Sequence, residues 1–292
     1  MTIRKKIVRL VLISGLLGAC GTEAGRQERV TAERQVYLPV VASRGQEPSP
    51  KRGLGTHHPE FCDDARLLGA SWQYNWKPDL GDCAGIEGVP MVYCWSDVGR
   101  IEEGLAQIGG DFGWLLGFNE PDIRQQCNLS PVEAARWWPR VEALARGRRM
   151  VSPAVVHPEW LRTFRAEYAR LYGRPPRMDA LAVHCYVNTA SGCQALAEEV
   201  IGYAREWGVG EVWVTEFSFF TQEGGLGKAE QEARSFMEWM EAEPMIGRYA
   251  WFPTRLDGSE YWRPNTFWLD QVLVDWSGSL TTWGELYFMV GR

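Results

Sequence analysis

Short apolar runs alternate with amphipathic helical patterns along most of this 292-residue chain, and this alternation constrains the fold more than any other feature. The runs that have the length and composition of strands lie at residues 51–57, 70–76, 89–95, 114–120, 148–156, 178–187, 210–220 and 246–255. The helical patterns between them are IEEGLAQIG, SPVEAARWWPRVEALARG, PEWLRTFRAEYARLYG, CQALAEEVIGYAREWG and KAEQEARSFMEWMEAE. Ser130, Pro131 and Glu133 supply the N-cap, the N1 proline and the capping-box acid of one helix. This alternation predicts a parallel sheet covered by helices.

The number and length of these repeats favour a single (β/α)8 TIM barrel, an α/β fold. Residues 52–292 have about the length that eight such units need, typically ~250 residues. The alternative is a doubly wound open sheet. No G-x-G-x-x-G follows the first predicted strand, and the strand ends carry acids and aromatic residues where nucleotide-binding folds carry glycine.

The segment before the barrel pattern is different in composition. Basic residues near the start precede a short apolar run, 10–17, which is far shorter than the ~20 residues that span a bilayer. Residues 1–19 are therefore predicted to be a signal peptide. The stretch Leu-Gly-Ala-Cys resembles the lipobox of bacterial lipoproteins, which favours lipidation at Cys20 over an ordinary cleaved signal. Residues 20–51 are mostly polar and predict a tether, so we expect an exported protein that meets the membrane only through its lipid.

Six of the seven cysteines remain when Cys20 is set aside, and an even number in an exported chain suggests disulfide bonds. Counting alone leaves many connectivities open. Pairing within one strand–helix unit or between consecutive units favours Cys62–Cys83, Cys94–Cys127 and Cys185–Cys193. The alternative for each is a buried, inert thiol.

Composition and motifs disfavour several other functional classes. The formal net charge of −6 offers no attraction to nucleic acid or anionic lipid. His57, His58, Asp63 and Asp64 form the best candidate metal cluster, but the aspartates follow in what reads as a helix start, and no C-x-x-C pair occurs for zinc. We therefore expect no metal. A Ser-His-Asp hydrolase is disfavoured because the chain has no G-x-S-x-G elbow.

Two glutamates stand at the ends of predicted strands. Glu120 ends the fourth run, WLLGFNEPD, where Pro121 is expected to stop the strand and hold Glu120 extended. Glu216 lies in the seventh run, GEVWVTEFSFF. A single acid at a strand end is often only a helix cap, but in a barrel both side chains would meet at the C-terminal mouth. Two carboxylates across one cleft suit cleavage of a glycosidic bond, in which one protonates the leaving oxygen and the other attacks or shields the anomeric carbon.

Five short motifs occur in order along residues 53–292: SWQYNW, LGFNEPD, SPAVV, HCY and TEF. Together they resemble glycoside hydrolase family 128, the endo-β-1,3-glucanases among the retaining barrel glycosidases. The resemblance implies Glu120 as the acid/base, Glu216 as the nucleophile, a β-glucan substrate with β-1,3 linkages, and no cofactor. The cysteines and the lipidated tether are not part of the resemblance.

Polar and aromatic side chains near these motifs form the expected substrate-binding set. His184 and Tyr186 share one strand face, where Tyr186 is placed to donate a hydrogen bond to Glu216, and Asn119 is placed to bond a sugar hydroxyl or the nucleophile. Each aromatic taken alone fits a protein core, but their concentration at one end of the barrel favours sugar stacking. The remaining members of the set are Trp72, Tyr74, Asn75, Trp76, Trp95, Phe219 and Trp251. The helical Trp137, Trp138, Trp207 and Trp239 are assigned to packing.

We therefore expect a monomeric, lipid-tethered glycoside hydrolase that acts on a β-glucan polysaccharide. One alternative is a carbohydrate-binding lipoprotein without catalysis, which the presence of both glutamates disfavours. The other is a barrel glycosidase that acts on another polysaccharide, such as xylan or mannan. Only substrate trials separate this alternative from the β-glucan hydrolase.

Overall fold

The computed structural model describes residues 49–291, apart from 57, 95–98, 100–102, 104–111, 222–223 and 257–269. The predicted signal peptide with Cys20, and nearly all of the predicted tether, lie outside the described residues. His57, Trp95 and most of the helix expected at 101–109 also lie outside them. Within the described part of the chain, no helix is both long and apolar enough to cross a membrane.

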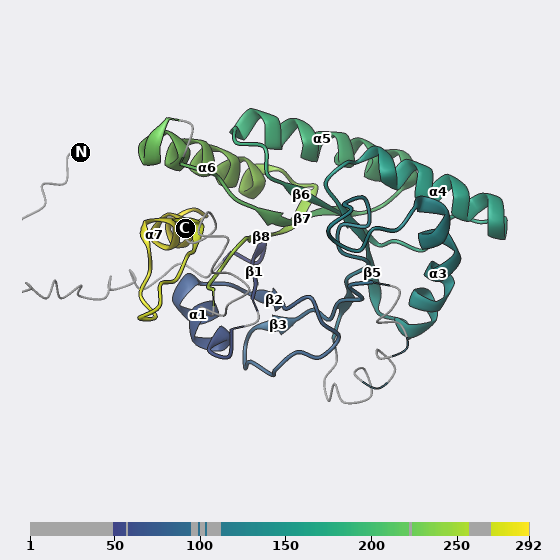
Figure 1. The fold of residues 1–292 in the computed structure, drawn as a ribbon, viewed down its shortest axis with the longest axis horizontal. Coiled ribbons are helices and arrows are strands. Elements are labelled where there is room, and N and C mark those ends of the chain that lie inside the picture. Colours follow the sequence, from purple (N-terminus) through teal and green to yellow (C-terminus); the bar gives the residue numbers. More distant parts are fainter. Residues whose placement is uncertain are drawn as a thin grey trace, which may run out of the picture. The chain divides into compact units, whose positions relative to one another are not determined.

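Eight parallel strands form one curled sheet in a TIM-like α/β fold (Figure 1). The strands are β1 Arg52–Gly55, β2 Trp72–Tyr74, β3 Glu87–Gly88, β4 Trp114–Leu115, β5 Arg149–Val155, β6 Ala180–Cys185, β7 Glu211–Phe217 and β8 Ile246–Trp251. Their order is β3-β2-β1-β8-β7-β6-β5-β4, so the first strand pairs with the last. All eight carboxyl ends therefore point to the same side of the sheet.

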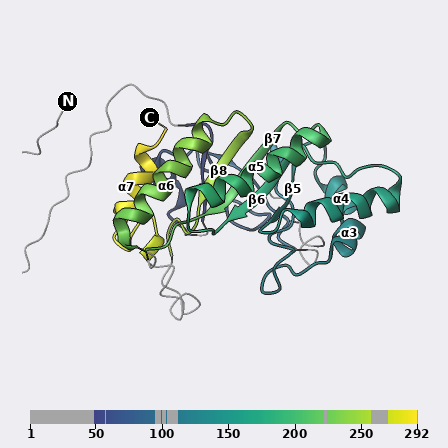
Figure 2. The same ribbon diagram turned by 90° about the horizontal axis from the view of Figure 1, so that it is seen from above.

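The helices lie on the outside of the curved sheet (Figure 1). Those described are α1 Phe61–Leu68, α3 Pro131–Leu144, α4 Glu159–Tyr172, α5 Ala190–Trp207, α6 Gly225–Ala242 and α7 Thr282–Met289. Helix α3 begins as predicted, because Ser130 accepts from the backbone N–H of Glu133 while the Glu133 side chain accepts from the backbone N–H of Ser130. Figure 2 shows α4, α5 and α6 along one side of the sheet. The connection from β2 to β3, residues 75–86, is described throughout and contains no helix, contrary to strict alternation.

The strand expected at 89–95 is wrong in its bounds, since β3 ends at Gly88. The chain beyond it still makes separate bonds, from Val89 N to the carbonyl of Gln73 (2.8 Å) and in a parallel bridge between Met91 and Leu116. Pro90 interrupts the ladder because it has no N–H to donate.

Tryptophans fill the inside of the curled sheet. The rings of Trp72 and Trp114 lie 5.2 and 4.8 Å from the ring of Trp213, and the guanidinium of Arg248 lies 4.5 Å above Trp213. Trp72, Trp114 and Trp213 expose 2% of their surface or less. These three tryptophans therefore stabilise the interior below the carboxyl ends of the strands.

All three predicted disulfides are confirmed. The Cα–Cα distances are 5.6 Å for Cys62–Cys83, 5.4 Å for Cys94–Cys127 and 5.6 Å for Cys185–Cys193, within the range that a disulfide spans. Cys94, expected inside a strand, lies in a bend after β3. The first bond joins α1 to the β2–β3 connection, and the third joins the end of β6 to α5.

Candidate active site

The two glutamates face each other at the carboxyl ends of the strands. Glu216 is next to last in β7, and Glu120 follows a bridge between Asn119 and Ala154 of β5. The sheet register pairs His184 of β6 with Glu216. One carboxylate oxygen of Glu120, one of Glu216 and a ring nitrogen of His184 lie within 4.8 Å of one another, and all three residues are buried. This geometry agrees with the expectation that the two acids meet at the carboxyl ends of the strands, the mouth of the predicted barrel.

Three hydrogen-bond donors surround the carboxylate of Glu216. The indole N–H of Trp76 donates to Oε1 at 2.8 Å, the hydroxyl of Tyr74 lies 3.3 Å from the same oxygen, and the hydroxyl of Tyr186 donates to Oε2. Burial and the charge of Glu216 raise the pKa of Tyr74 and Tyr186 well above the usual 10.0, so both hydroxyls keep their protons. Donors on both oxygens orient the carboxylate and stabilise its charge.

His184 lies between the two acids. Its Nδ1 is 2.8 Å from Oε1 of Glu120 and 3.5 Å from Oε2 of Glu216. Burial lowers the pKa of His184, but the charge of Glu216 and the bond to Glu120 outweigh that effect and raise it above 6.5. Burial raises the pKa of Glu216, the charge of His184 opposes the rise, and the charge of Glu120 adds to it, so the pKa lies above its usual 4.5.

The backbone at the site takes conformations that the sequence did not predict. Glu120 has φ 41° and Trp76 has φ 58°, both in the left-handed region, so the expectation of an extended Glu120 is wrong. The N–H of Glu120 donates to the carbonyl of Ala154 (2.8 Å) and its carbonyl accepts from Ile123 (3.1 Å), and these bonds override the bias from the following proline. Non-glycine residues with positive φ concentrate at functional sites.

The two asparagines of the expected binding set are both close to the mouth. Asn119 is 3% exposed, and its Oδ1 has no hydrogen-bond partner among the described residues. Asn75 uses its amide locally, donating to the carbonyl of Asp79 (2.8 Å) and accepting from the backbone N–H of Lys77 (3.1 Å). Asn75 therefore shapes the connection after β2.

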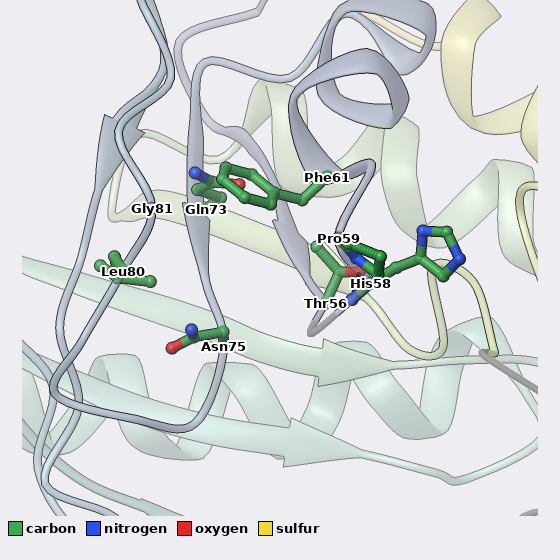
Figure 3. A pocket seen from close by; sticks show the side chains of 8 residues that line it. All are labelled: Thr56, His58, Pro59, Phe61, Gln73, Asn75, Leu80 and Gly81. Atoms are coloured by element: carbon green, nitrogen blue, oxygen red, sulfur yellow. Dashed lines mark hydrogen bonds between the residues drawn. The ribbon is translucent and has the colours of Figure 1, made fainter. Parts of the chain in front are cut away.

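A pocket of about 110 Å³ opens beside the carboxyl ends of β1 and β2 (Figure 3). It is lined by Thr56, His58, Pro59, Phe61, Gln73, Asn75, Leu80 and Gly81. Gln73 is only 2% exposed, and its Nε2 has no partner among the described residues. The pocket adjoins the mouth but includes neither glutamate.

Trp72 is not placed to stack on a sugar at the mouth. It is 1% exposed, its Nε1 donates to the carbonyl of Lys51 at 2.9 Å, and its ring packs on Trp213. Trp72 and Tyr74 point to the same inner face, but Trp72 lies two residues, roughly 6.6 Å, further from the carboxyl end of the strand. Of these two aromatic residues, only Tyr74 reaches Glu216.

Two other expected platforms are also wrong. Trp251 is 1% exposed, donates to the carbonyl of Gln271 at 2.8 Å and packs 5.1 Å from the ring of Trp283 on α7. Phe219 is fully buried against Phe236 of α6. Both side chains point to the outer face of the sheet, between strands and helices, where the strand pleat puts every second residue.

The helical tryptophans were correctly assigned to packing. Trp138 is fully buried, while Trp137, Trp207 and Trp239 are partly buried against the core. Sequence reasoning missed Phe252, whose half-buried ring lies 5.6 Å from Trp76 at a nearly perpendicular 85°. The run WFP at the end of the last strand carries the signal, but it holds two neighbouring rings, and the structure places Phe252 rather than Trp251 beside Trp76.

A curled parallel sheet with two buried carboxylates at its carboxyl ends defines a glycoside hydrolase of TIM-like fold. The family model described as "Glycosyl hydrolase catalytic core" matches residues 56–287, and the chain belongs to that family. Within it the chain belongs to glycoside hydrolase family 128, as the likeness to solved members shows.

Two of these solved structures share nearly a third of their residues with the chain. A subgroup II endo-β-1,3-glucanase from Pseudomonas viridiflava is 30% identical with a TM-score of 0.67, covering 83% of this chain and 98% of that one. A subgroup III curdlan-specific exo-β-1,3-glucanase from Blastomyces gilchristii is 29% identical with a TM-score of 0.66, covering 84% and 100%. A subgroup I enzyme from Amycolatopsis mediterranei, 22% identical with a TM-score of 0.65 and coverage of 83% and 100%, shares the fold. No curated protein matches the chain.

Proposed function

We propose that this glycoside hydrolase cleaves β-1,3-glucan internally and with retention of anomeric configuration. The observation that carries the proposal is the distance between the two carboxylates. An oxygen of Glu120 and an oxygen of Glu216 lie within 4.8 Å of each other, and a ring nitrogen of His184 lies within the same distance of both. Retaining glycosidases hold their two carboxyl groups about 5–5.5 Å apart, whereas inverting ones leave a wider gap for a water.

The surroundings of each carboxylate support a division of roles. Glu216, held by Trp76 and Tyr186, attacks the anomeric carbon and forms a glycosyl ester, while Glu120 gives its proton to the leaving glycosidic oxygen. In the second step Glu120 takes a proton from water, the water oxygen bonds to the anomeric carbon, and the ester bond to Glu216 breaks. His184 contacts both acids, so its ring can stabilise negative charge at either carboxylate.

The choice of polysaccharide rests on the relatives. The proteins from Pseudomonas viridiflava and Sorangium cellulosum, 30% and 28% identical, are endo-β-1,3-glucanases of one subgroup, and the protein from Blastomyces gilchristii is an exo-β-1,3-glucanase. All three act on β-1,3-glucan, and the two subgroup II relatives favour internal cleavage for this chain.

A panel of polysaccharides tests the proposal. The protein is incubated with curdlan, laminarin, mixed-linkage β-glucan, cellulose, xylan and mannan, and new reducing ends and product lengths are measured, with Glu216→Gln as the inactive control. We expect release of oligosaccharides of several lengths from the β-1,3-glucans alone. Release of glucose only would indicate exo action, and cleavage of xylan or mannan would contradict the substrate. Binding without any cleavage would favour a carbohydrate-binding lipoprotein.

We also propose that the eight strands close into a complete (β/α)8 barrel. Support comes from the backbone bonds between the segments that follow β3 and β4: Val92 N donates to the carbonyl of Leu116 (3.0 Å), and Leu116 N to that of Pro90 (2.9 Å). Slow amide hydrogen exchange at Val92 and Leu116 is the expected result, and rapid exchange at both would contradict closure.

We propose that the protein is exported and is anchored to a membrane through a lipid on Cys20. We also propose that it is a monomer. The three disulfides support an oxidising compartment. The parent should partition into detergent, whereas Cys20→Ser should remain in the aqueous phase. Equal partitioning of the two proteins would contradict the anchor.

A further inference from the structure

Trp276 exposes 63% of its surface, more than any other large apolar side chain that the structure describes. Single exposed apolar residues are common on proteins, so exposure alone indicates nothing. Trp276 differs in the support beneath it and in its place on the fold.

The turn that carries Trp276 is held rigidly. Oδ1 of Asp275 accepts from the backbone N–H groups of Ser277 (2.8 Å) and Ser279 (3.0 Å) and from the Ser277 hydroxyl (2.7 Å). The backbone N–H of Asp275 donates to the carbonyl of Ser279 at 2.9 Å, and Gly278 takes φ 79°, which glycine adopts freely. A ligand that meets the indole of Trp276 therefore loses little binding free energy to ordering of the turn.

The turn is attached to the same edge of the sheet as the two glutamates. The carbonyl of Thr254, just beyond the end of β8, accepts from the backbone N–H groups of Leu273 (2.9 Å) and Val274 (3.0 Å). Arg255 donates through Nε to the carbonyl of Asp275 at 3.1 Å. These bonds place the turn at the rim of the mouth, next to β8.

The pocket of Figure 3 lies beside this turn. Nη1 of Arg255 lies 3.2 Å from Nδ1 of His58, which lines the pocket beside β1. Asn75 lines the opposite part of the pocket, and the next residue, Trp76, donates to Glu216. Gln73 also lines the pocket, and its unpartnered Nε2 is a donor for a ligand oxygen. The pocket and the turn therefore both lie at the carboxyl ends of the strands, next to β1 and β8.

We propose that Trp276 is the aromatic platform of an accessory carbohydrate-binding site, where it stacks on pyranose rings of a polysaccharide chain that extends from the mouth over the rim next to β8. The indole face supplies apolar contact to the sugar C–H groups, and the neighbouring pocket offers polar groups to the hydroxyls of the same chain. The identity of the polysaccharide, a β-glucan, rests on the proposed function. Short oligosaccharides that occupy only the mouth do not reach Trp276.

Binding to insoluble β-1,3-glucan tests the platform without hydrolysis when all proteins carry Glu216→Gln. Depletion from the supernatant is measured for this parent, for Trp276→Ala and for Trp276→Tyr. We expect Trp276→Ala to weaken binding about tenfold, as loss of a stacked ring and its buried area implies, and Trp276→Tyr to keep most of the affinity. Met289→Ala is the matched control, because Met289 is 51% exposed but lies at the far end of α7, beside Phe288, whose carbonyl accepts from Arg52 at the start of β1.

A second measurement uses proteins with the active site intact. Trp276→Ala should lose activity on the polymer while its kcat/KM on a short laminari-oligosaccharide stays at the parent value. Equal binding and equal polymer activity of Trp276→Ala and the parent would overturn the platform and leave the proposed function standing. If the parent hydrolyses no β-glucan, the proposed function fails. Binding of the parent and of Trp276→Ala is then compared on a polysaccharide that does bind the parent. Equal binding of the two proteins, or no polysaccharide that binds the parent, overturns the platform as well.

Discussion

His184 is fully buried and points one ring nitrogen at Glu120, with Nδ1 2.8 Å from Oε1. The same nitrogen lies 3.5 Å from Glu216. A histidine that keeps its proton in this position offsets the repulsion between two buried carboxylates. It therefore links the ionisation of Glu216 to the charge of His184, and the pH dependence of activity should report that link.

Replacement of His184 by Gln should move the acid limb of the pH profile to higher pH. Glu216 must be ionised to attack, so activity is present above its pKa and is lost as the pH falls through it, at a value above the usual 4.5 because burial raises the pKa. The charge of His184 opposes that rise, and its removal should raise the pKa of Glu216 further. Profiles of kcat/KM against pH measure the shift.

We expect activity of the His184→Gln variant to fall by about ten- to a hundredfold at acidic pH, as loss of a charged hydrogen bond implies. The matched control is His157→Gln, because His157 is a largely exposed histidine that pairs with Asp122. An acid limb that stays in place, or moves to lower pH, in His184→Gln would contradict the link.

The two glutamates should respond differently to leaving-group ability. Glu120→Ala should lose ~10²–10⁴-fold activity on polysaccharide, where the leaving oxygen needs a proton, but much less on aryl glycosides with good leaving groups. Glu216→Ala should lose activity on both, because no covalent intermediate forms. Proton NMR of the first product should show the β-anomer. An α-anomer appearing first would mean inversion and would contradict the nucleophile.

The sequence predicted those parts of the structure that depend on local pattern. Glu120 and Glu216 come at the ends of apolar runs, and in a parallel sheet all such ends meet on one side, so the pairing of the acids followed from topology alone. The disulfides followed for the same reason, since neighbouring strand–helix units are neighbours in space.

Side-chain direction at the strand ends was harder to predict. Trp251 and Phe252 differ by one position, and that position decides which face of the sheet a ring occupies. The structure buries Trp251 against Trp283, a residue 32 positions later that no local pattern relates to β8. The positive φ of Glu120 likewise depends on a bond to Ala154 of another strand.

Trp251→Ala should destabilise the protein rather than weaken substrate binding directly. The side chain is 1% exposed and contacts Phe217 (5.1 Å) and Trp283 (5.1 Å), so its removal leaves a cavity in the layer between the sheet and α7. The free energy of unfolding should fall by about 3–5 kcal/mol, measured by urea titration. Trp276→Ala is the comparison, because an exposed tryptophan should change the same free energy by less than about 0.5 kcal/mol. Weakened binding with unchanged stability in Trp251→Ala would instead place its ring at the sugar.

Tyr186 and Tyr74 both approach Glu216, but removal of their hydroxyls should have unequal effects. The hydroxyl of Tyr186 donates directly to Oε2 of Glu216. The hydroxyl of Tyr74 lies 2.9 Å from the carbonyl of Thr215 and 3.3 Å from Oε1 of Glu216, so its proton is directed mainly to the backbone. Tyr186→Phe should therefore lower kcat by about ten- to a hundredfold, the range for a hydrogen bond to a charged group, with a smaller loss in Tyr74→Phe.

Steady-state kinetics on a soluble β-1,3-glucan, with the urea stability of both variants as the control, measure this difference. Tyr74→Phe should lose more stability than Tyr186→Phe, since Tyr74 is 1% exposed and its hydroxyl holds the backbone of β7, whereas Tyr186 is only half-buried. Equal losses of kcat would mean that orientation of Glu216 depends on both hydroxyls alike. A greater loss in Tyr74→Phe at full folding would assign the main contact of the nucleophile to the tyrosine of β2.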